Sequence, residues 1–313
     1  MKKILLSVVK PTGIAHIGNY FGAMKQWIDL QLEHDCYFMI ADYHGLNFIQ
    51  NKDEMSRNIL DLTLDYLAIG LDSNKSVIFK QSDVSAHTEL AWIFDTITTM
   101  PYLMRAHAFK DAEIKNKEIS VGTFNYPMLM AADILLYNTD IVPVGQDQKQ
   151  HIEFTRDTAQ KFNNIFGETF KLPEAMIMKE VAVVPGIDGQ KMSKSYGNTI
   201  PLFATRDEIQ KAVMSIVTDS SGEIPLNVYN IHKLLKSENE LKDMYDTNKG
   251  KYKVLKDALI EDLDAFIKPM RERREELAKN TDAVKEILKN GAMKAKERAD
   301  AKLLQVKKNI GVL

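Results

Sequence analysis

The chain has 313 residues, of which 45% are hydrophobic and 27% charged, and its formal net charge is −2 at pH 7. These values fit a globular protein with one large domain or two smaller ones. They exclude a uniformly basic coat for nucleic acid. Residues 231–313 nevertheless carry more Lys and Arg than Asp and Glu, which suits either a polyanion partner or a solvated helical surface.

One cysteine, Cys36, is present, so an intrachain disulfide and a thiol-based zinc site are both excluded. A reducing, cytoplasmic setting fits this cysteine usage. The apolar run at residues 4–9 is too short for a signal peptide and lacks a small-residue cleavage site. No stretch approaches the roughly 20 apolar residues of a membrane helix, so no membrane association is expected.

The first part of the chain alternates short apolar runs with helical patterns. Strands are predicted at residues 4–9, 36–41, 77–79 and 141–144, and helices at residues 17–28, 55–69, 90–97 and 126–137. Such alternation predicts an α/β fold, a Rossmann-like doubly wound parallel sheet with helices on both faces. These sheets bind ligands beyond the carboxyl ends of their strands. We therefore expect residues 10–19, 42–44 and 145–148 to line one pocket.

From about Asp207 onward the patterns are helical only. Thr205 is the predicted N-cap of the first helix, with Asp207 and Glu208 in its first turn. Lysine-rich amphipathic stretches follow, with breaks expected near Gly250, Pro269 and residues 290–291. We predict a catalytic domain at residues 1–200 and a helical C-terminal domain at residues 201–313, whose last helix can pack back on the catalytic domain.

Two short motifs indicate a site for a nucleotide. His16-Ile17-Gly18-Asn19 opens the first helix, where backbone N–H groups favour a phosphate and Gly18 permits close approach. Lys191-Met192-Ser193-Lys194-Ser195 lies among Gly186, Gly189 and Gly197, and its lysines could close over a triphosphate and offset charge on a leaving pyrophosphate. The alternatives are a helix cap for the first motif and a solvated loop for the second.

The predicted helix at residues 126–137 contains a single carboxylate, Asp133, among apolar residues. A buried carboxylate needs a hydrogen-bond donor. That donor is either a group within the protein or the N–H of a ligand, and an indole ring offers one N–H on an otherwise apolar surface.

In this order, HIGN after the first strand and KMSKS near the end of the α/β region resemble the paired signatures of the class I aminoacyl-tRNA synthetases. Residues 131–145 and 147–157 narrow the resemblance to the tryptophanyl-tRNA synthetase family. It covers most of residues 1–218 and weakens to general helical similarity beyond. The resemblance implies ATP-dependent activation of L-tryptophan, transfer to tRNA(Trp), ATP with phosphate-bound Mg²⁺ and no protein metal cage, and a homodimer whose C-terminal helices read the anticodon.

The resemblance also implies roles for individual residues in the tryptophan site. Asp133 holds the indole N–H. The ring pocket is shaped by Leu6, His44, Met130, Val142 and Val144. Tyr126 and Gln148 bind the α-amino group.

The remaining roles concern ATP. Asp147 holds the ribose, Gly18 and Gly145 let adenosine approach the backbone, and Met192 packs near the adenine. The phosphates are contacted by His16, Asn19, Lys191 and Lys194, which are the predicted catalytic residues. Further ATP-binding residues are Lys10, Thr12, Lys115, Ser193 and Ser195.

The chain departs from the family at several of these positions. Lys10 stands where glutamine is common, Leu6 where an aromatic residue is, and Gln146 where Glu is usual, while Tyr196-Gly197 replace a frequent Asp-Pro. The role of Lys10 is therefore open between a phosphate and the substrate carboxylate.

Three other functions stay open at this point. A tyrosyl-tRNA synthetase shares the fold and both signatures. A small-molecule adenylyltransferase would lack the helical tail and the two-lysine block. A catalytically silent, synthetase-like binding protein would not need Lys191 and Lys194.

Overall fold

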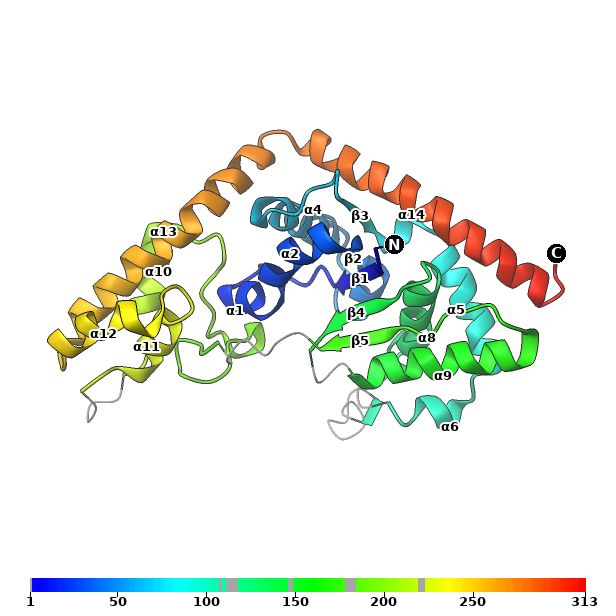
Figure 1. The fold of residues 1–313 in the computed structure, drawn as a ribbon, viewed down its shortest axis with the longest axis horizontal. Coiled ribbons are helices and arrows are strands. Elements are labelled where there is room, and N and C mark those ends of the chain that lie inside the picture. Colours follow the sequence, from blue (N-terminus) through cyan, green and yellow to red (C-terminus); the bar gives the residue numbers. More distant parts are fainter. Residues whose placement is uncertain (1, 107–108, 111–117, 146–148, 178–183, 219–222) are drawn as a thin grey trace.

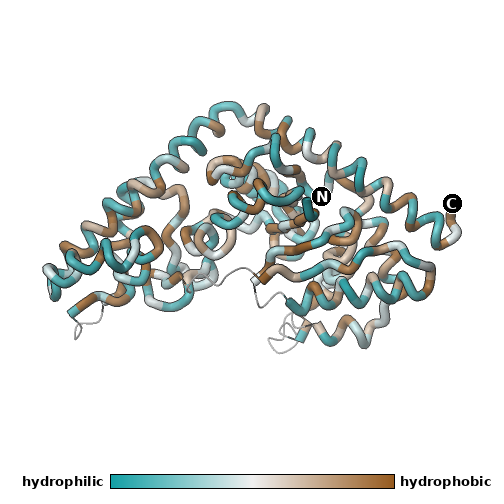
Figure 2. The backbone as a smooth tube through the Cα atoms, viewed as in Figure 1, coloured by the Kyte–Doolittle hydropathy of each residue, from teal (hydrophilic) through white to brown (hydrophobic). Residues whose placement is uncertain are grey.

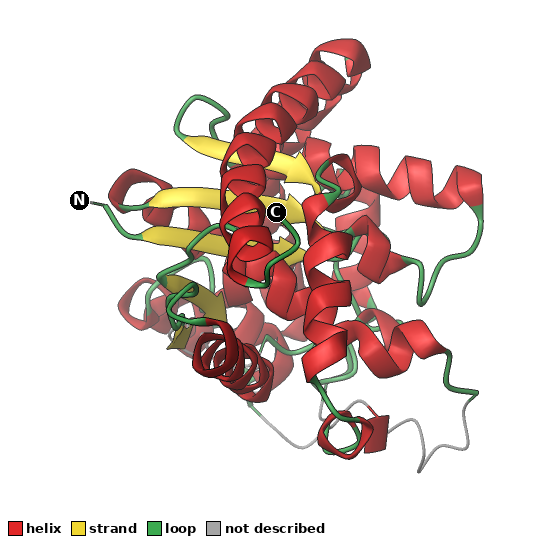
Figure 3. Cartoon of the chain, turned by 90° about the vertical axis from the view of Figure 1, so that its right-hand side faces the viewer, coloured by secondary structure: helices red, strands yellow, loops and turns green. Residues whose placement is uncertain are grey.

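Five parallel strands form the centre of the computed structural model, which describes residues 2–106, 109–110, 118–145, 149–177, 184–218 and 223–313. Their order is β3-β2-β1-β4-β5. The bounds are Ile4–Val9 (β1), Asp35–Ile40 (β2), Ser76–Lys80 (β3), Ile141–Val144 (β4) and Glu174–Ile177 (β5). The predicted parallel sheet is confirmed, and helices cover both of its faces (Figures 1 and 3).

Strand alternation divides the interior into two apolar layers. Successive side chains of a strand point to opposite faces, so Leu5 belongs to one buried cluster and Leu6 to the other. Helices α1 (Ile17–Asn19), α2 (Lys25–Glu33), α4 (Lys52–Ile69), α10 (Arg206–Met214) and α13 (Tyr252–Ala278) contribute to the first cluster. Helices α5 (Ala86–Ile97), α8 (Val121–Leu135), α9 (Lys149–Phe166) and α14 (Thr281–Asn309) contribute mainly to the second.

Shorter helices and helical turns complete the fold. They are a π-helical turn at Tyr20–Met24, α3 (Asp42–Gly45), α6 (Met100–Leu103), α11 (Leu226–His232), α12 (Glu238–Thr247) and 3-10 turns at Gln81–Asp83 and Lys194–Tyr196. The predicted cap at Thr205 is confirmed: the Glu208 side chain accepts from the Thr205 backbone N–H at 2.8 Å, and Thr205 Oγ1 accepts from that of Glu208 at 3.3 Å.

Two predicted breaks in the helical region are wrong. Pro269 lies inside α13, where it removes one backbone hydrogen bond but does not end a helix held by buried Leu263 and Ile267. Asn290 and Gly291 lie inside α14. The break near Gly250 is confirmed, since this residue has a φ of +73° between α12 and α13. The sequence analysis also missed β5, whose apolar run is short, and the amphipathic α9.

The two long helices α13 and α14 meet at an apex and span the molecule (Figure 1). Both alternate hydrophobic and hydrophilic residues along their length (Figure 2). Helix α14 lies against the edge strand β3. A Cβ on Gly291 would stand 1.9 Å from the Ile78 carbonyl oxygen, so glycine allows the helix backbone to touch the strand. The helix thereby covers an edge that would otherwise be open to pairing.

Among the described residues, no helix is both long and apolar enough to cross a membrane.

Candidate active site

The polar segment after β1 and the chain around Lys191–Ser195 meet at the carboxyl end of the sheet. The strand order reverses between β1 and β4, which is where doubly wound sheets bind nucleotides. His16 begins α1 with extended backbone, and the Asn19 side chain accepts a hydrogen bond from its backbone N–H at 3.1 Å. The His16–Asn19 motif is therefore a helix cap, which was one of its two interpretations. It also lies at the edge of the sheet where a ligand is expected.

Gly18 is required by its neighbours. A Cβ at this position would lie 2.9 Å from His16 Nδ1 and 3.3 Å from the Cβ of Met192. The imidazole and the buried Met192 side chain thus pack against the glycine. This contact joins the two motifs, which are far apart in the sequence.

His16 has the properties of a neutral ligand-binding group. Burial, with a further contribution from the charge of Lys194, lowers the pKa of His16 to about 4, so the imidazole is uncharged at neutral pH. Its Nδ1 atom is buried and has no hydrogen-bond partner among the described residues. A buried ring nitrogen without a partner is costly, and in the tautomer protonated at Nδ1 it could donate a hydrogen bond to a ligand oxygen.

Lys194 connects the two loops directly. Its Nζ donates to the backbone carbonyls of Thr12 and Gly13, each at 2.9 Å. Two backbone hydrogen bonds fasten the following segment to the first loop, from Ile17 N–H to the Ile200 carbonyl at 3.0 Å and from Leu202 N–H to the Ala15 carbonyl at 2.9 Å. Burial lowers the pKa of Lys194, and Asp65 opposes this effect.

Asn198 organises the loop that carries the lysines, although the sequence analysis did not identify it. Its side-chain oxygen accepts from the Ser193 backbone N–H at 2.8 Å, and its amide donates to Asp188 at 2.7 Å and to the Lys191 carbonyl at 3.2 Å. Gly186 has no room for a side chain because Asn198 lies against it. The exposed side chains of Lys191 and Ser195 project from this frame.

Asp133 is fully buried and is surrounded by three polar side chains. Gln81 Nε2 donates to both carboxylate oxygens at 2.8 and 3.0 Å, and His44 Nε2 lies 2.9 Å from Oδ2. His87 Nδ1 lies 2.6 Å from Oδ1, outside good hydrogen-bond alignment, while its Nε2 pairs with the Tyr137 hydroxyl at 2.8 Å. Donors within the protein therefore satisfy the buried carboxylate, which is one of the two possibilities that the sequence left open.

This environment keeps the carboxylate ionised. Burial by itself raises the pKa of Asp133, but the charge of His87 and the close contacts of His44 and His87 with the carboxylate outweigh it, and the pKa falls to about 2. A carboxylate offers about four acceptor positions, and Gln81, His44 and His87 together make four contacts with it, so a ligand N–H has to replace one of them. Because Asp133 has no exposed surface, a ligand reaches it only when a neighbouring side chain moves.

The other residues predicted for tryptophan lie on the elements that surround Asp133. Leu6 and Val142 are buried, and Met130, Val144 and Tyr126 are partly buried. The rings of His44 and Tyr126 are 6.3 Å apart. The Tyr126 hydroxyl pairs with His151 Nε2 at 2.5 Å, and burial raises the pKa of Tyr126 to about 12.

Of the remaining residues singled out in the sequence, some are described by the structure and others are not. Gly145 is exposed directly after β4. The Lys10 ammonium lies 4.4 Å from the centre of the Phe48 ring, a cation–π contact. Lys115, Asp147 and Gln148, as well as Gln146, lie outside the described residues.

Gln81 and His87 are site residues that the sequence analysis missed. Gln81 directly follows β3, so the same rule that selected polar residues after the first two strands would have found it. His87 lies on α5 beside the polar residues Thr88 and Glu89, and its sequence context contains no signal of its partner.

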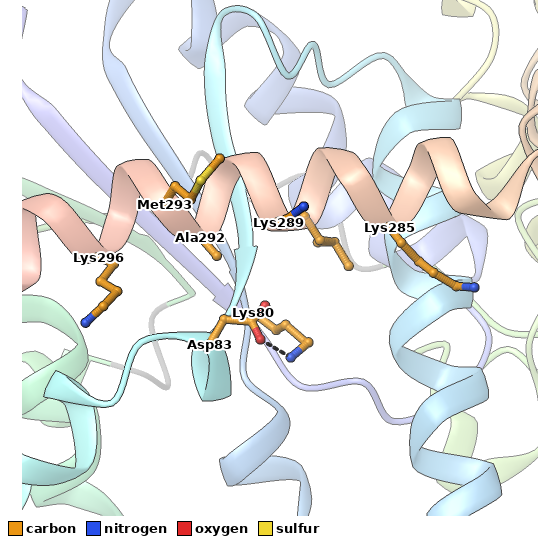
Figure 4. Close-up of a pocket in the computed structure, with 8 residues that line it drawn as sticks. Lys80, Asp83, Lys285, Lys289, Ala292, Met293 and Lys296 are labelled. Atoms are coloured by element: carbon orange, nitrogen blue, oxygen red, sulfur yellow. Dashed lines mark hydrogen bonds and ion pairs between the residues drawn. The ribbon is translucent and has the colours of Figure 1, made fainter.

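A separate pocket of about 400 Å³ lies between the end of β3 and α14 (Figure 4). It is lined by Lys80, Asp83, Lys285, Leu288, Lys289, Ala292, Met293 and Lys296. Each of its lysines has a carboxylate close by, and none of the residues predicted for ATP or tryptophan lines it. Among the described residues, no group of three or more His, Cys, Asp or Glu could hold a metal ion.

The geometry suits two ligand groups. Lys191, Lys194 and His16 can receive an anion at the carboxyl end of β1, and Asp133 can accept the N–H of a ligand in place of one of its present donors.

Comparisons with known proteins agree with this chemistry. The family model described as tRNA synthetases class I (W and Y) matches residues 2–298. The tryptophan–tRNA ligase of Fusobacterium nucleatum subsp. nucleatum is 47% identical over 98% of this chain and 98% of that protein, and the one of Rhodopirellula baltica is 43% identical over 98% and 99%. The structure of Campylobacter jejuni tryptophanyl-tRNA synthetase complexed with ADP and tryptophan matches with a TM-score of 0.93 and 43% identity, over 98% of this chain and 99% of that one.

Proposed function

Because the chain belongs to the class I tRNA synthetases of the tryptophan and tyrosine family, we propose that it activates L-tryptophan with ATP and transfers the tryptophanyl group to tRNA(Trp). The observation that carries the activation step is the junction of Lys194 with the Thr12 and Gly13 carbonyls. It places the loop lysines, His16 and Asn19 at one edge of the sheet. The choice of tryptophan rests on Asp133 and on the names of relatives that match over nearly the whole chain.

The reaction has two steps. A carboxylate oxygen of tryptophan attacks the α-phosphorus of ATP, a new P–O bond forms, and the bond to the bridging oxygen breaks to release pyrophosphate. A hydroxyl of the terminal tRNA ribose then attacks the acyl carbon, and AMP leaves. The attacking carboxylate is already ionised at neutral pH, so the first step needs no general base.

The protein contributes by positioning and by charge. Lys191 and Lys194 offset the charge that develops on the leaving pyrophosphate, and neutral His16 and Asn19 donate to the phosphates. Mg²⁺ enters bound to the phosphates of ATP, where it supplies further charge neutralisation. Asp133 accepts the indole N–H, and Tyr126 binds near the α-amino group. Lys10, Thr12, Ser193 and Ser195 complete the ATP site, with Met192 near the adenine.

The proposal is tested by amino-acid-dependent exchange of labelled pyrophosphate into ATP. The wild type should exchange with tryptophan and not with tyrosine, and Lys194→Ala should lower kcat by about 10²- to 10³-fold, the typical effect of removing one charge-stabilising donor. Lys279→Ala, which removes an exposed lysine at the end of α13, is the matched control and should behave as the wild type.

Each other outcome has a definite meaning. Exchange with tyrosine alone would indicate a tyrosyl-tRNA synthetase. No exchange from folded protein with Mg²⁺ present would favour the silent binding protein.

The protein is also proposed to be a homodimer acting in the cytoplasm, with the helical region at residues 201–313 contacting the anticodon. Exposed apolar residues support the dimer: Trp92 and Val121 are 70% and 80% exposed, and Met100 and Met104 lie nearby in sequence. These residues belong to α5, the α6 region and the start of α8. Helix α8 packs against both α5 and α6. Contiguous exposed apolar surface marks protein interfaces, and we propose that these four residues form such a patch.

Charge introduced into this patch should separate the subunits. Trp92→Lys combined with Val121→Lys should reduce the mass in light scattering from twice the 35.6 kDa chain mass to the chain mass. Leu226→Lys, at an equally exposed apolar residue on α11, should leave a dimer. A wild type that is monomeric at micromolar concentration would contradict the proposal.

A further inference from the structure

Two arginines on α13 contact the chain just beyond the lysine loop. Arg271 and Arg274 are three residues apart and so lie on one face of the helix. Arg271 Nη1 donates to the Ala204 carbonyl at 2.6 Å and to Asp264 of its own helix at 3.0 Å. The guanidinium carbon of Arg274 lies 5.3 Å from the centre of the Phe203 ring. Both arginines therefore hold residues 203–204.

Arg274 also connects α13 to α4. Its Nε donates to Asp65 at 2.6 Å and its Nη2 donates to Asp61 at 2.7 Å. Asp65 is only 3% exposed, and charge-assisted hydrogen bonds in such surroundings are strong and geometrically specific. One side chain thus joins the helical region, the catalytic core and the exit of the loop. Helix α13 packs along both α4 and α10 (Figure 1).

The held segment leads directly back to the lysines. Residues 200–202 are fastened to residues 15–17 by two backbone hydrogen bonds, and Lys194 binds the same first loop through Thr12 and Gly13. Residues 203–204 are therefore joined to the loop through a short, hydrogen-bonded segment.

Charge connects the same groups. Burial raises the pKa of Asp65 to about 6, Arg274 opposes the rise, Asp61 adds to it, and Lys194 lowers it. The field of the loop lysine therefore reaches the carboxylate that Arg274 holds.

We propose that Arg271 and Arg274 are positioning residues for Lys191 and Lys194: they fix the exit of the loop to α13 so that the lysines are held where the triphosphate binds. This inference rests on the proposed function, and it assigns a role to two residues that do not touch the substrates. A positioning role acts on kcat more than on the binding of tryptophan, because the lysines are needed when charge develops on pyrophosphate.

The test uses substitutions that keep the helix and most of the packing. Arg271→Met keeps the apolar stem, and Arg274→Lys keeps the charge but loses the planar fork. We expect each to lower kcat of pyrophosphate exchange about tenfold, while KM for tryptophan stays within about twofold. Arg273→Gln is the matched control, because Arg273 is an exposed arginine of the same helix between the two, and it should match the wild type.

A second readout does not depend on activity. The rate of tryptic cleavage after Lys191 and Lys194, followed by mass spectrometry, should rise severalfold in Arg271→Met and Arg274→Lys and not in Arg273→Gln. Unchanged kcat and unchanged cleavage in folded variants would overturn the inference. The inference would also be overturned if all kinetic constants fell equally and in proportion to a lower Tm, because that result indicates a structural role only.

The two proposals fail in different ways. If wild-type protein shows no exchange, the proposed function fails and the cleavage rates still decide whether the arginines hold the loop. If exchange is normal and Lys194→Ala abolishes it while the arginine variants keep wild-type kcat and cleavage, only the arginine inference fails.

Discussion

Asp133→Asn should lower kcat/KM for tryptophan by at least about 10²-fold in pyrophosphate exchange, because an indole N–H then loses its ionised acceptor. The asparagine has the same shape but only one carbonyl oxygen, and its amide N–H groups face the donors of Gln81 and His44. The effect on the substrate is therefore a loss of charge and of acceptor positions, with little change in volume. Asp133→Ala should be at least as severe.

The same substitution should also lower stability. Removing one member of a buried, charged cluster typically costs about 3–5 kcal/mol. The wild-type carboxylate has a pKa lowered to about 2, so its stabilising contribution is present above the unfolded pKa of about 4 and is lost as the pH falls towards 2. The difference in unfolding free energy between wild type and Asp133→Asn should accordingly narrow between pH 5 and pH 2.

Asp95→Asn is the control for these measurements. Asp95 is a half-buried aspartate on α5 that accepts a hydrogen bond from Asn125, and it is not one of the described residues that surround Asp133. It should leave tryptophan kinetics unchanged. Retention of wild-type kcat/KM by a folded Asp133→Asn protein would show that the indole N–H is recognised elsewhere.

Gly291→Ala should destabilise the protein by about 3 kcal/mol, at the upper end of the usual range for overpacking. The new Cβ would meet the backbone of Ile78 at 1.9 Å from its oxygen and 2.7 Å from its carbonyl carbon. A sheet backbone cannot turn away as a flexible side chain can. Either α14 lifts from β3 or the strand shifts.

Helix propensity alone predicts that Gly291→Ala raises the stability of the protein. The sign of the measured change in stability therefore distinguishes the two effects. Alanine in the interior of a helix is favoured over glycine by about 1 kcal/mol, so an uncrowded site would gain stability. Gly22→Ala provides that control, because no atom lies within 4 Å of its added Cβ. Thermal unfolding of both variants beside the wild type should show a lower Tm for Gly291→Ala and an equal or higher Tm for Gly22→Ala. A raised Tm for Gly291→Ala would mean that α14 does not lie on the strand in solution.

Pattern and spacing predicted the local structure correctly where the physical signal is local. The apolar run at Ile4–Val9 became β1 with the same bounds, and Thr205 caps α10 as expected. In each case neighbouring residues in the sequence contain the whole signal. The family resemblance added the pairing of the two motifs, and the Lys194 contacts to Thr12 and Gly13 place them together.

Predictions from neighbouring residues were wrong where a residue type is explained by contacts with a distant part of the chain. Gly291 looks like a helix break, yet it is glycine because α14 crosses β3, which is more than 200 residues earlier in the sequence. Pro269 also looks like a break, but a helix with a long buried face continues through the loss of one backbone hydrogen bond.

The sequence by itself determined the fold class, the edge of the sheet where ligands are expected and the chemical character of the lysine loop and of Asp133. These follow from strand alternation, from the shared direction of parallel strands and from the charge of single side chains. Only the tertiary structure decided which groups surround Asp133, why Gly18 and Gly291 must be glycine, and that Arg271 and Arg274 hold the exit of the lysine loop. Hydrogen bonds and close packing act over a few ångströms, so partners such as Gln81, His87 and Arg274 are fixed only when folding brings distant segments within that range.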